Sequence, residues 1–243
     1  MPNRPPAPDD VHGLLLVDKP AGWTSHDVVA KVRGHFRLRK VGHGGTLDPM
    51  ATGLLVLLLG RGTRLSERVM GSDKVYEGAL RLGRATDTED ADGTVVEERD
   101  WRPVTAEQVA AAMASRQGDQ MQTPPMVSAV KRDGVPLYKL ARKGKTVERE
   151  PRLIHVYSFT LLDFAPPDAA FRMACTKGTY VRTLCADIGR ELGCGAHLAR
   201  LRRTASGAMR VADAQPLEAV LAIPPEALAA AVIPMERALA AGL

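Results

Sequence analysis

Apolar and polar positions along this chain follow two different periods, which predicts interleaved strands and helices. Short apolar runs at Gly13 to Val17 and Leu54 to Leu59 have the length of buried strands. Residues 74–82 alternate as a strand does. One face of that strand would carry Val75, Glu77, Ala79 and Arg81.

Helices are predicted where capping residues precede a helical pattern. Thr24 or Ser25 can cap a helix that ends at Gly34, and Thr105 with Gln108 forms a capping-box pattern before an alanine-rich helix. The remaining elements that we expect are helices at 61–70, 106–116, 180–192 and from 216 onward, and strands at 153–164 and 170–176. Because this order has no clean βαβ rhythm, the pattern favours an α+β domain with a mixed sheet.

Basic residues cluster, which bears on the class of partner. Residues 131–152 hold eight basic and three acidic side chains, a net charge of +5, which equals the net charge of the whole chain. Two further stretches, Lys31 to Lys40 and Arg200 to Arg210, contain no acidic residue. A solvated face explains any one cluster equally well, but three clusters together favour a nucleic acid as partner.

Several classes of protein are excluded by what the sequence lacks. No apolar run approaches the roughly 20 residues needed to cross a bilayer, and residues 1–10 are expected to be a disordered leader. The three cysteines form no CxxC pair, which argues for a reducing, cytoplasmic setting without disulfides or zinc. We expect them to be buried small hydrophobic residues.

Common cofactor and metal motifs are also missing. The chain has no P-loop and no HExxH, and its glycine loop is GHGG, which is not the dinucleotide-binding GxGxxG. The acidic turn at 87–93 resembles a calcium loop only superficially, because its first position is Thr88 and its twelfth is Arg99. A surface turn is the better interpretation, and no metal or cofactor is expected.

Residues 42–53 form the most unusual segment, with four glycines in twelve residues. Pro49 keeps Asp48 out of helical geometry, so a single carboxylate stands on a stiff turn between flexible glycines. An apolar strand follows and can anchor the turn. On these residues alone an ordinary Asp-Pro turn is favoured over a catalytic one.

The string GHGGTLDPMATGLL closely resembles the catalytic motif of the TruB-type pseudouridine synthases. Further blocks resemble the same family in the same order: KPAGWTS from Lys19, KVY from Lys74, LGRATDT from Leu82, KGTYVRT from Lys177, and GCGAHL with LRR from Gly193. Together they cover roughly residues 13–210, so the resemblance is specific to this family. It implies an α+β fold with a mixed, largely antiparallel sheet, flanking helices and a central RNA-binding cleft.

The resemblance also implies a role for particular residues. Asp48 would be the catalytic carboxylate, Arg182 would pair with it, and Tyr76 would stack on the target base. His43 would help displace the target nucleotide, and Leu201 would pack near the base. Tyr180 is counted with the substrate-binding residues, and Lys19 and Pro20 would support the catalytic loop. Whether Asp48 attacks the sugar, attacks the base or removes a ribose proton stays open.

The implied reaction converts a uridine to pseudouridine at position 55 in the T-loop of tRNA. This isomerisation needs no cofactor, metal or energy source. The implied RNA-binding insertion spans about residues 121–152, and its basic candidates are Lys131, Arg132, Lys139, Arg142, Lys143 and Lys145. A monomer with a catalytic domain at 11–212 and a helical extension at 213–243 is expected. The appended C-terminal RNA-binding domain of many bacterial members is expected to be absent or nearly so.

Another interpretation is a non-catalytic protein that binds tRNA and assists its folding on the same scaffold. Such a protein would keep the basic clusters but could lose Asp48 or Arg182. Both residues are present, which favours the enzyme.

Overall fold

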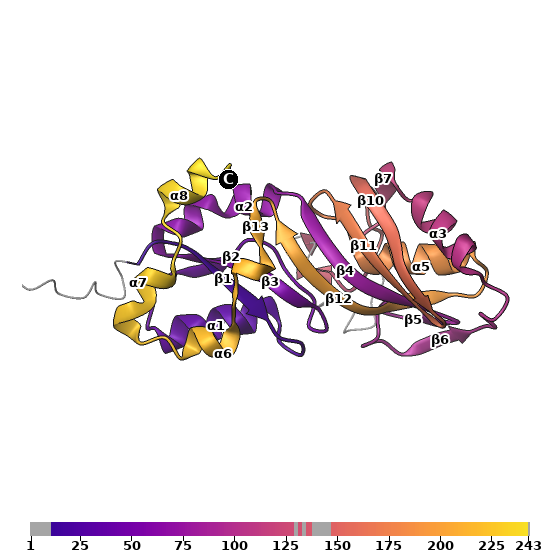
Figure 1. Cartoon of the computed structure of the whole chain (residues 1–243), viewed down its shortest axis with the longest axis horizontal. Coiled ribbons are helices and arrows are strands. Elements are labelled where there is room, and N and C mark those ends of the chain that lie inside the picture. The colour runs from indigo at the N-terminus through magenta and orange to yellow at the C-terminus, as the bar shows by residue number, and fades with distance from the viewer. Residues whose placement is uncertain (1–10, 129–130, 133–134, 138–146, 243) are drawn as a thin grey trace, which may run out of the picture. The chain divides into compact units, whose positions relative to one another are not determined.

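The computed structural model describes residues 11–128, 131–132, 135–137 and 147–242, which fall into two compact units (Figure 1). The first unit joins residues 1–74 to residues 202–243, and the second spans residues 75–201. The leader expected at residues 1–10 lies outside the described residues. No helix of the described segments is long and apolar enough to cross a membrane.

The first unit is a small sheet covered by helices. Its strand order is β14-β1-β3-β12, with β2 beside β3 and β13 beside β12. The β1/β3, β2/β3 and β12/β13 pairs are antiparallel, whereas β1/β14 and β3/β12 are parallel. The elements are β1 (Gly13–Lys19), α1 (Ser25–His35), β2 (Val41–His43), β3 (Thr52–Leu59), the 3-10 helix η2 (Gly60–Leu65), α2 (Ser66–Gly71), β12 (Ala196–Ser206, which begins in the second unit), β13 (Met209–Arg210), η3 (Val211–Asp213), β14 (Gln215–Pro216), α6 (Leu217–Leu221), η4 (Pro225–Ala227), α7 (Leu228–Ala231) and α8 (Met235–Ala240).

Strand β3 forms the centre of this unit because both of its faces are apolar. Leu54 to Leu59 are all buried, as their continuous apolar run predicted. On one face Leu54 and Val56 pack with Val69 of α2 and Ala238 of α8. Figure 1 shows α1 and α6 on the opposite side of the sheet from α2 and α8. A strand held on both faces is a rigid support for the loop that precedes it.

The second unit is built on a longer sheet. Its strand order is β12-β4-β11-β10-β7, and the β10/β11 and β10/β7 pairs are antiparallel. Two short hairpins, β5/β6 and β8/β9, are antiparallel as well. The elements are β4 (Lys74–Leu82), β5 (Arg84–Thr86), β6 (Val95–Glu98), α3 (Ala106–Ala114), β7 (Gly118–Gln122), β8 (Lys131–Arg132), β9 (Val135–Pro136), β10 (Arg152–Ala165), β11 (Asp168–Cys175) and α5 (Val181–Glu191).

The core of the second unit lies between its sheet and the helices α3 and α5. Phe159 of β10 and Phe171 of β11 meet edge to face with ring centroids 5.1 Å apart. Val109 of α3 and Leu184 of α5 are fully buried. Figure 1 shows both helices beside β10 and β11. This packing holds the first turn of α5, which carries Arg182, in a fixed place.

The predicted α+β class with a largely antiparallel sheet is confirmed. The capping box predicted at Thr105 is present at the start of α3. Of the two candidate caps of α1, Thr24 is the N-cap, and it also forms a capping box, with Asp27, that was not predicted. The single helix predicted at 61–70 is instead η2 followed by α2. The strand β12 at 196–206 was not predicted, because its many charged residues hide the alternation.

Candidate active site

Asp48 lies on a turn in the first unit and its side chain is half-buried. The N–H of Ala51 donates to the carbonyl of Asp48 at 3.1 Å, which closes a four-residue turn with Pro49 in its second position. Proline presets the backbone angle at that position, so the turn is stiff. The Asp-Pro turn expected from the residues alone is therefore present, and it presents a carboxylate.

Two neighbouring segments form hydrogen bonds to this turn. The Ser25 hydroxyl accepts from the N–H of Leu47 at 2.8 Å and donates to the carbonyl of Leu47 at 3.1 Å. On the other side, the N–H of Gly22 donates to the carbonyl of Pro49 at 2.9 Å. The residues immediately before and after Asp48 are thus both held by hydrogen bonds.

Lys19 is fully buried beneath the turn. Its ammonium donates to the carbonyls of Pro20 at 2.9 Å, Trp23 at 2.6 Å and Pro49 at 3.3 Å. Burial lowers the pKa of Lys19 to about 8, although the charge of Asp48 opposes this shift. These contacts link the end of β1 to the turn at Pro49, and the loop-support role of Lys19 and Pro20 stays a prediction. A cation held at this place also favours the ionised form of the nearby Asp48.

His43 ends strand β2 and is partly buried. Its Nδ1 accepts the N–H of Gly45 at 3.3 Å, so in the neutral ring the proton sits on Nε2. Burial, and then the charge of Arg203, lower the pKa of His43 from its ordinary value. Both effects favour the neutral form of the His43 ring.

Arg203 is the site residue that sequence reasoning missed. Its side chain is buried, and its guanidinium donates to the carbonyls of Leu54 at 2.7 Å, Thr46 at 3.3 Å and Gly45 at 3.2 Å. The available signal was its place in the LRR block. That block lies in a stretch without acids, which suggested an RNA-facing surface, whereas Arg203 points into the protein.

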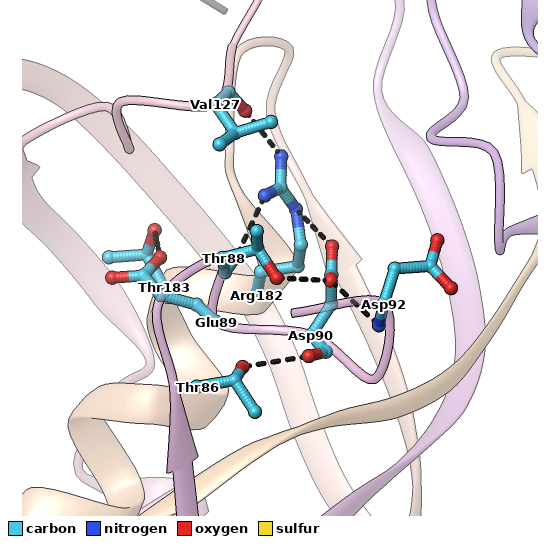
Figure 2. Close-up of polar contacts among 8 residues, drawn as sticks. All are labelled: Thr86, Thr88, Glu89, Asp90, Asp92, Val127, Arg182 and Thr183. Carbon is cyan, nitrogen blue, oxygen red and sulfur yellow. Dashed lines mark hydrogen bonds and ion pairs between the residues drawn. The ribbon is translucent and has the colours of Figure 1, made fainter. Parts of the chain in front are cut away.

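In the second unit, Arg182 lies in the first turn of α5 and is buried (Figure 2). It donates to the carbonyls of Thr88 and Val127, each at 2.9 Å. Its Nε lies 3.5 Å from a carboxylate oxygen of Asp90. Arg182 therefore connects α5 to the acidic turn and to the segment that follows β7.

The acidic turn at 87–93 is held by hydrogen bonds within the turn and to α5 (Figure 2). The carboxylate of Asp90 accepts from the Thr88 hydroxyl at 2.6 Å and from the N–H of Asp92 at 3.1 Å. Thr183, next to Arg182, donates its hydroxyl to Glu89 at 2.6 Å. Burial raises the pKa of Glu89, while the Thr183 hydrogen bond and the charge of Arg182 oppose that shift. The surface turn expected here is instead a partly buried partner of α5.

The other predicted substrate-binding residues also belong to the second unit. Tyr76 on β4 and Leu201 on β12 are buried. Tyr180 precedes α5, and its backbone N–H and carbonyl are both bonded to the side chain of Gln122, at 2.8 and 3.0 Å. This pair of bonds fixes the start of the helix that carries Arg182.

The basic insertion is described only in part. Lys131 and Arg132 form the short strand β8. Lys139, Arg142, Lys143 and Lys145 lie outside the described residues.

The three cysteines lie in the interior of the protein. Cys175, Cys185 and Cys194 are buried thiols outside any disulfide, as predicted. Within the described segments no group of three or more His, Cys, Asp and Glu side chains could hold a metal ion.

Comparisons with known proteins identify the family. A model of the TruB family pseudouridylate synthase N-terminal domain matches residues 33–181, and one of the tRNA pseudouridylate synthase B C-terminal domain matches residues 182–240. A tRNA pseudouridine synthase B from Opitutus terrae is 54% identical over 229 residues, covering 94% of this chain and 95% of the relative. One from Syntrophotalea carbinolica is 51% identical over 216 residues, covering 89% of this chain and 71% of the relative.

Solved structures agree with this result. A chain of a Cbf5-Nop10-Gar1 complex superposes with a TM-score of 0.73 at 29% identity, covering 99% of this chain and 68% of the other. A chain of an H/ACA RNP bound to a substrate RNA containing 2'-deoxyuridine gives a TM-score of 0.71 at 26% identity, covering 99% and 67%. This chain belongs to the TruB family of pseudouridylate synthases.

Proposed function

We propose that this chain isomerises uridine to pseudouridine at position 55 in the T-loop of tRNA, with Asp48 as the reacting carboxylate. Its family membership makes it a tRNA pseudouridine synthase. The T-loop position and the roles of individual residues are our proposal. The observation that carries it is the mounting of Asp48 on a stiff turn whose flanking backbone is hydrogen-bonded on both sides.

The reaction explains why such a mounting is useful. Isomerisation breaks the bond from the ribose C1' to uracil N1, rotates the base, and forms a bond from C1' to C5. A proton leaves C5 and N1 takes one up. Atoms and electrons balance without a cofactor or a metal. A carboxylate that acts on the nucleotide must hold its position and its charge while the base rotates. The turn fixes the position of the Asp48 carboxylate, and the positive charge of Lys19 helps to keep that carboxylate ionised.

Arg182, Tyr76 and Leu201 take the roles that the family resemblance implies. Moving a base out of its stack costs a few kcal/mol, and stacking on Tyr76 can return roughly 1–3 kcal/mol of this. Leu201 would exclude water, which otherwise would add to the ribose C1' and let the detached base escape. The pairing of Arg182 with Asp48 stays a prediction. Its support is the rigid placement of Arg182 by Thr88, Val127 and Asp90.

Binding of the T-arm would rest on charge and loop shape. Exposed basic side chains on α1 and just after it include Lys31, Arg33 and Arg37. Residues 28–47 contain no acid, so this surface attracts phosphates. RNA loops are recognised mainly by shape and by splayed bases.

The decisive experiment uses unmodified tRNA with tritium at C5 of its uridines. We expect the purified chain to release tritium without added metal or cofactor, and the new pseudouridine to map to the T-loop. Tritium release at other uridines would keep the chemistry and refute the site. Binding of tRNA without release would refute the enzyme and favour the tRNA-folding alternative.

A further inference from the structure

Arg203 is a buried cation, and among the described residues its guanidinium donates to three backbone carbonyls. Its side chain is only 2% exposed, and the carbonyls belong to Gly45, Thr46 and Leu54. Removing a charge from water is expensive unless hydrogen bonds compensate it. An aliphatic side chain would fill this space at less cost, so the guanidinium serves a purpose other than packing.

That purpose is visible in the order of the three acceptors along the chain. Gly45 and Thr46 lie just before Asp48, and Leu54 lies after it, in the buried part of β3. We call the segments just before and just after Asp48 the two arms of the loop. The planar guanidinium, with its fixed donor directions, therefore holds both arms. The flexible ammonium of a lysine cannot impose the same geometry.

A close backbone contact places the arginine at this point. Arg203 of β12 is the register partner of Gly53 in β3. Gly53 has a φ of +98°, and a Cβ atom there would lie 2.3 Å from the carbonyl oxygen of Arg203. Glycine thus permits both the positive φ and the approach of β12. The approach sets the Cα of Arg203 opposite the outgoing arm of the loop.

The charge of Arg203 also acts on the side chains around Asp48. It contributes to the lowered pKa of Lys19 and to that of His43. The charge of Asp48, in turn, acts to raise the pKa of Lys19. The carboxylate therefore belongs to a coupled set of charges in which Lys19 holds the turn at Pro49 and Arg203 holds the loop arms.

We propose that Arg203 is a positioning residue for the isomerisation, because it fixes both arms of the Asp48 loop and so holds the carboxylate in its reacting place. This inference rests on the proposed role of Asp48. Arg203 acts through the loop backbone and does not need to touch the RNA. Its removal should slow the chemical step more than it weakens tRNA binding.

The test compares Arg203→Met, Arg203→Lys and the matched control Arg202→Met. Arg202 precedes Arg203 on the same strand but pairs with Asp18, at 2.6 and 3.0 Å. For each variant, single-turnover tritium release gives the rate of chemistry, filter binding gives the Kd for tRNA, and thermal melting gives the folded fraction.

We expect Arg203→Met to slow single turnover by about 100-fold, the effect of a roughly 1 Å misplacement, with a Kd within about threefold of the wild type. Arg203→Lys keeps the positive charge but lacks the planar guanidinium. Its single-turnover rate should therefore fall between those of the wild type and of Arg203→Met. Arg202→Met should retain its rate within about threefold. This graded order, at nearly constant Kd, would support positioning.

A wild-type single-turnover rate in folded Arg203→Lys and Arg203→Met would overturn the inference and leave Arg203 a purely structural residue. If the Met variant does not fold, the Lys variant decides: a rate within twofold of the wild type refutes positioning. Failure of the proposed function is recognised separately, because the wild-type chain would then release no tritium.

Discussion

The Ser25 hydroxyl bonds to both polar backbone atoms of Leu47, accepting from its N–H at 2.8 Å and donating to its carbonyl at 3.1 Å. Ser25 is the first residue of α1, and Leu47 directly precedes Asp48. A serine hydroxyl can donate and accept at once, so one side chain replaces a strand partner for Leu47. The helix start therefore holds one side of the Asp48 turn.

Removing this hydroxyl should harm catalysis and stability together. In Ser25→Ala the buried N–H and carbonyl of Leu47 lose their partner, at a cost of about 1–3 kcal/mol. The turn should then move, and we expect single-turnover release of tritium to slow by at least about tenfold. Thermal melting and the tritium assay measure the two effects.

Thr24→Ala is the matched control for this prediction. Thr24 caps the same helix through Asp27, and its loss costs about 1 kcal/mol, but its side chain makes no hydrogen bond to Leu47 among the described contacts. The folded Thr24→Ala protein should keep its rate. An equal loss of rate in both variants would show that helix stability is what matters, and not the bond to Leu47.

Lys19 should give the activity an alkaline limit. Because burial lowers its pKa to about 8, raising the pH removes the charge beside Asp48 and weakens the hydrogen bonds to Pro20, Trp23 and Pro49. We expect the rate of single turnover to fall as the pH rises through about 8. In Lys19→Arg, which stays charged, this limit should disappear. Ionisation of the uracil ring would affect both proteins alike, so an identical decline would refute the role of Lys19.

The same group should have the opposite effect on stability. Folded Lys19 releases its proton near pH 8, whereas an ordinary lysine keeps it to about 10.5. Between these values the unfolded chain binds more protons, so the contribution of Lys19 to the free energy of unfolding rises with pH. Denaturant melts at several pH values give the slope of the free energy of unfolding against pH. The difference in slope between the wild type and Lys19→Arg should be the contribution of Lys19.

Asp48→Asn should separate binding from chemistry. The amide has nearly the same size as the carboxylate, so the turn closed by Asp48 and Ala51 should persist. We expect tRNA to bind with a Kd within about threefold of the wild type and tritium release to stop. Retained turnover in this variant would remove Asp48 from the mechanism.

Local signals predicted the parts of the fold that depend on local physics. The helix cap at Thr24 or Ser25, the capping box at Thr105 and the apolar run that became β3 involve residues close in sequence, so a pattern can reveal them. Strand β3 begins at Thr52, two residues before the apolar run, because pairing with β12 extends it. Pairing partners lie far apart in sequence and leave no such trace.

Buried polar residues are the part that pattern reasoning could not predict. Arg203 belongs to a stretch without acids, which is typical of a solvated or RNA-facing surface. Its acceptors, Gly45, Thr46 and Leu54, lie about 150 residues earlier in the chain and surround it only after folding. Asp90 and Arg182 are likewise far apart in sequence and meet only after folding. The acidic turn was therefore expected at the surface, although Asp90 is buried beside Arg182.

Glu89 should destabilise the fold at neutral pH. Burial raises its pKa, so the folded chain holds this proton to a higher pH than the unfolded chain, and stability falls as the pH rises from about 4.5. Glu89→Gln removes the charge and can still accept the Thr183 hydrogen bond. We expect a higher melting temperature than the wild type at pH 7 and no difference near pH 4. The exposed Glu226→Gln is the control, and an equal gain there would contradict the assignment to burial.

The basic residues on α1 and just after it should control the affinity for tRNA but not the chemistry. Lys31, Arg33 and Arg37 are exposed and lie in a stretch without acids, whereas Asp48 is held by other contacts. Replacing all three by Gln should weaken binding and reduce the slope of log Kd against log salt by about 0.7–0.9 for each phosphate that the protein no longer neutralises. Single turnover at saturating protein should be unchanged. Arg237→Gln on α8 is the control for the loss of one positive charge elsewhere on the protein. If the slope matches that of the wild type, the stretch is a solvated face and the T-arm is held elsewhere.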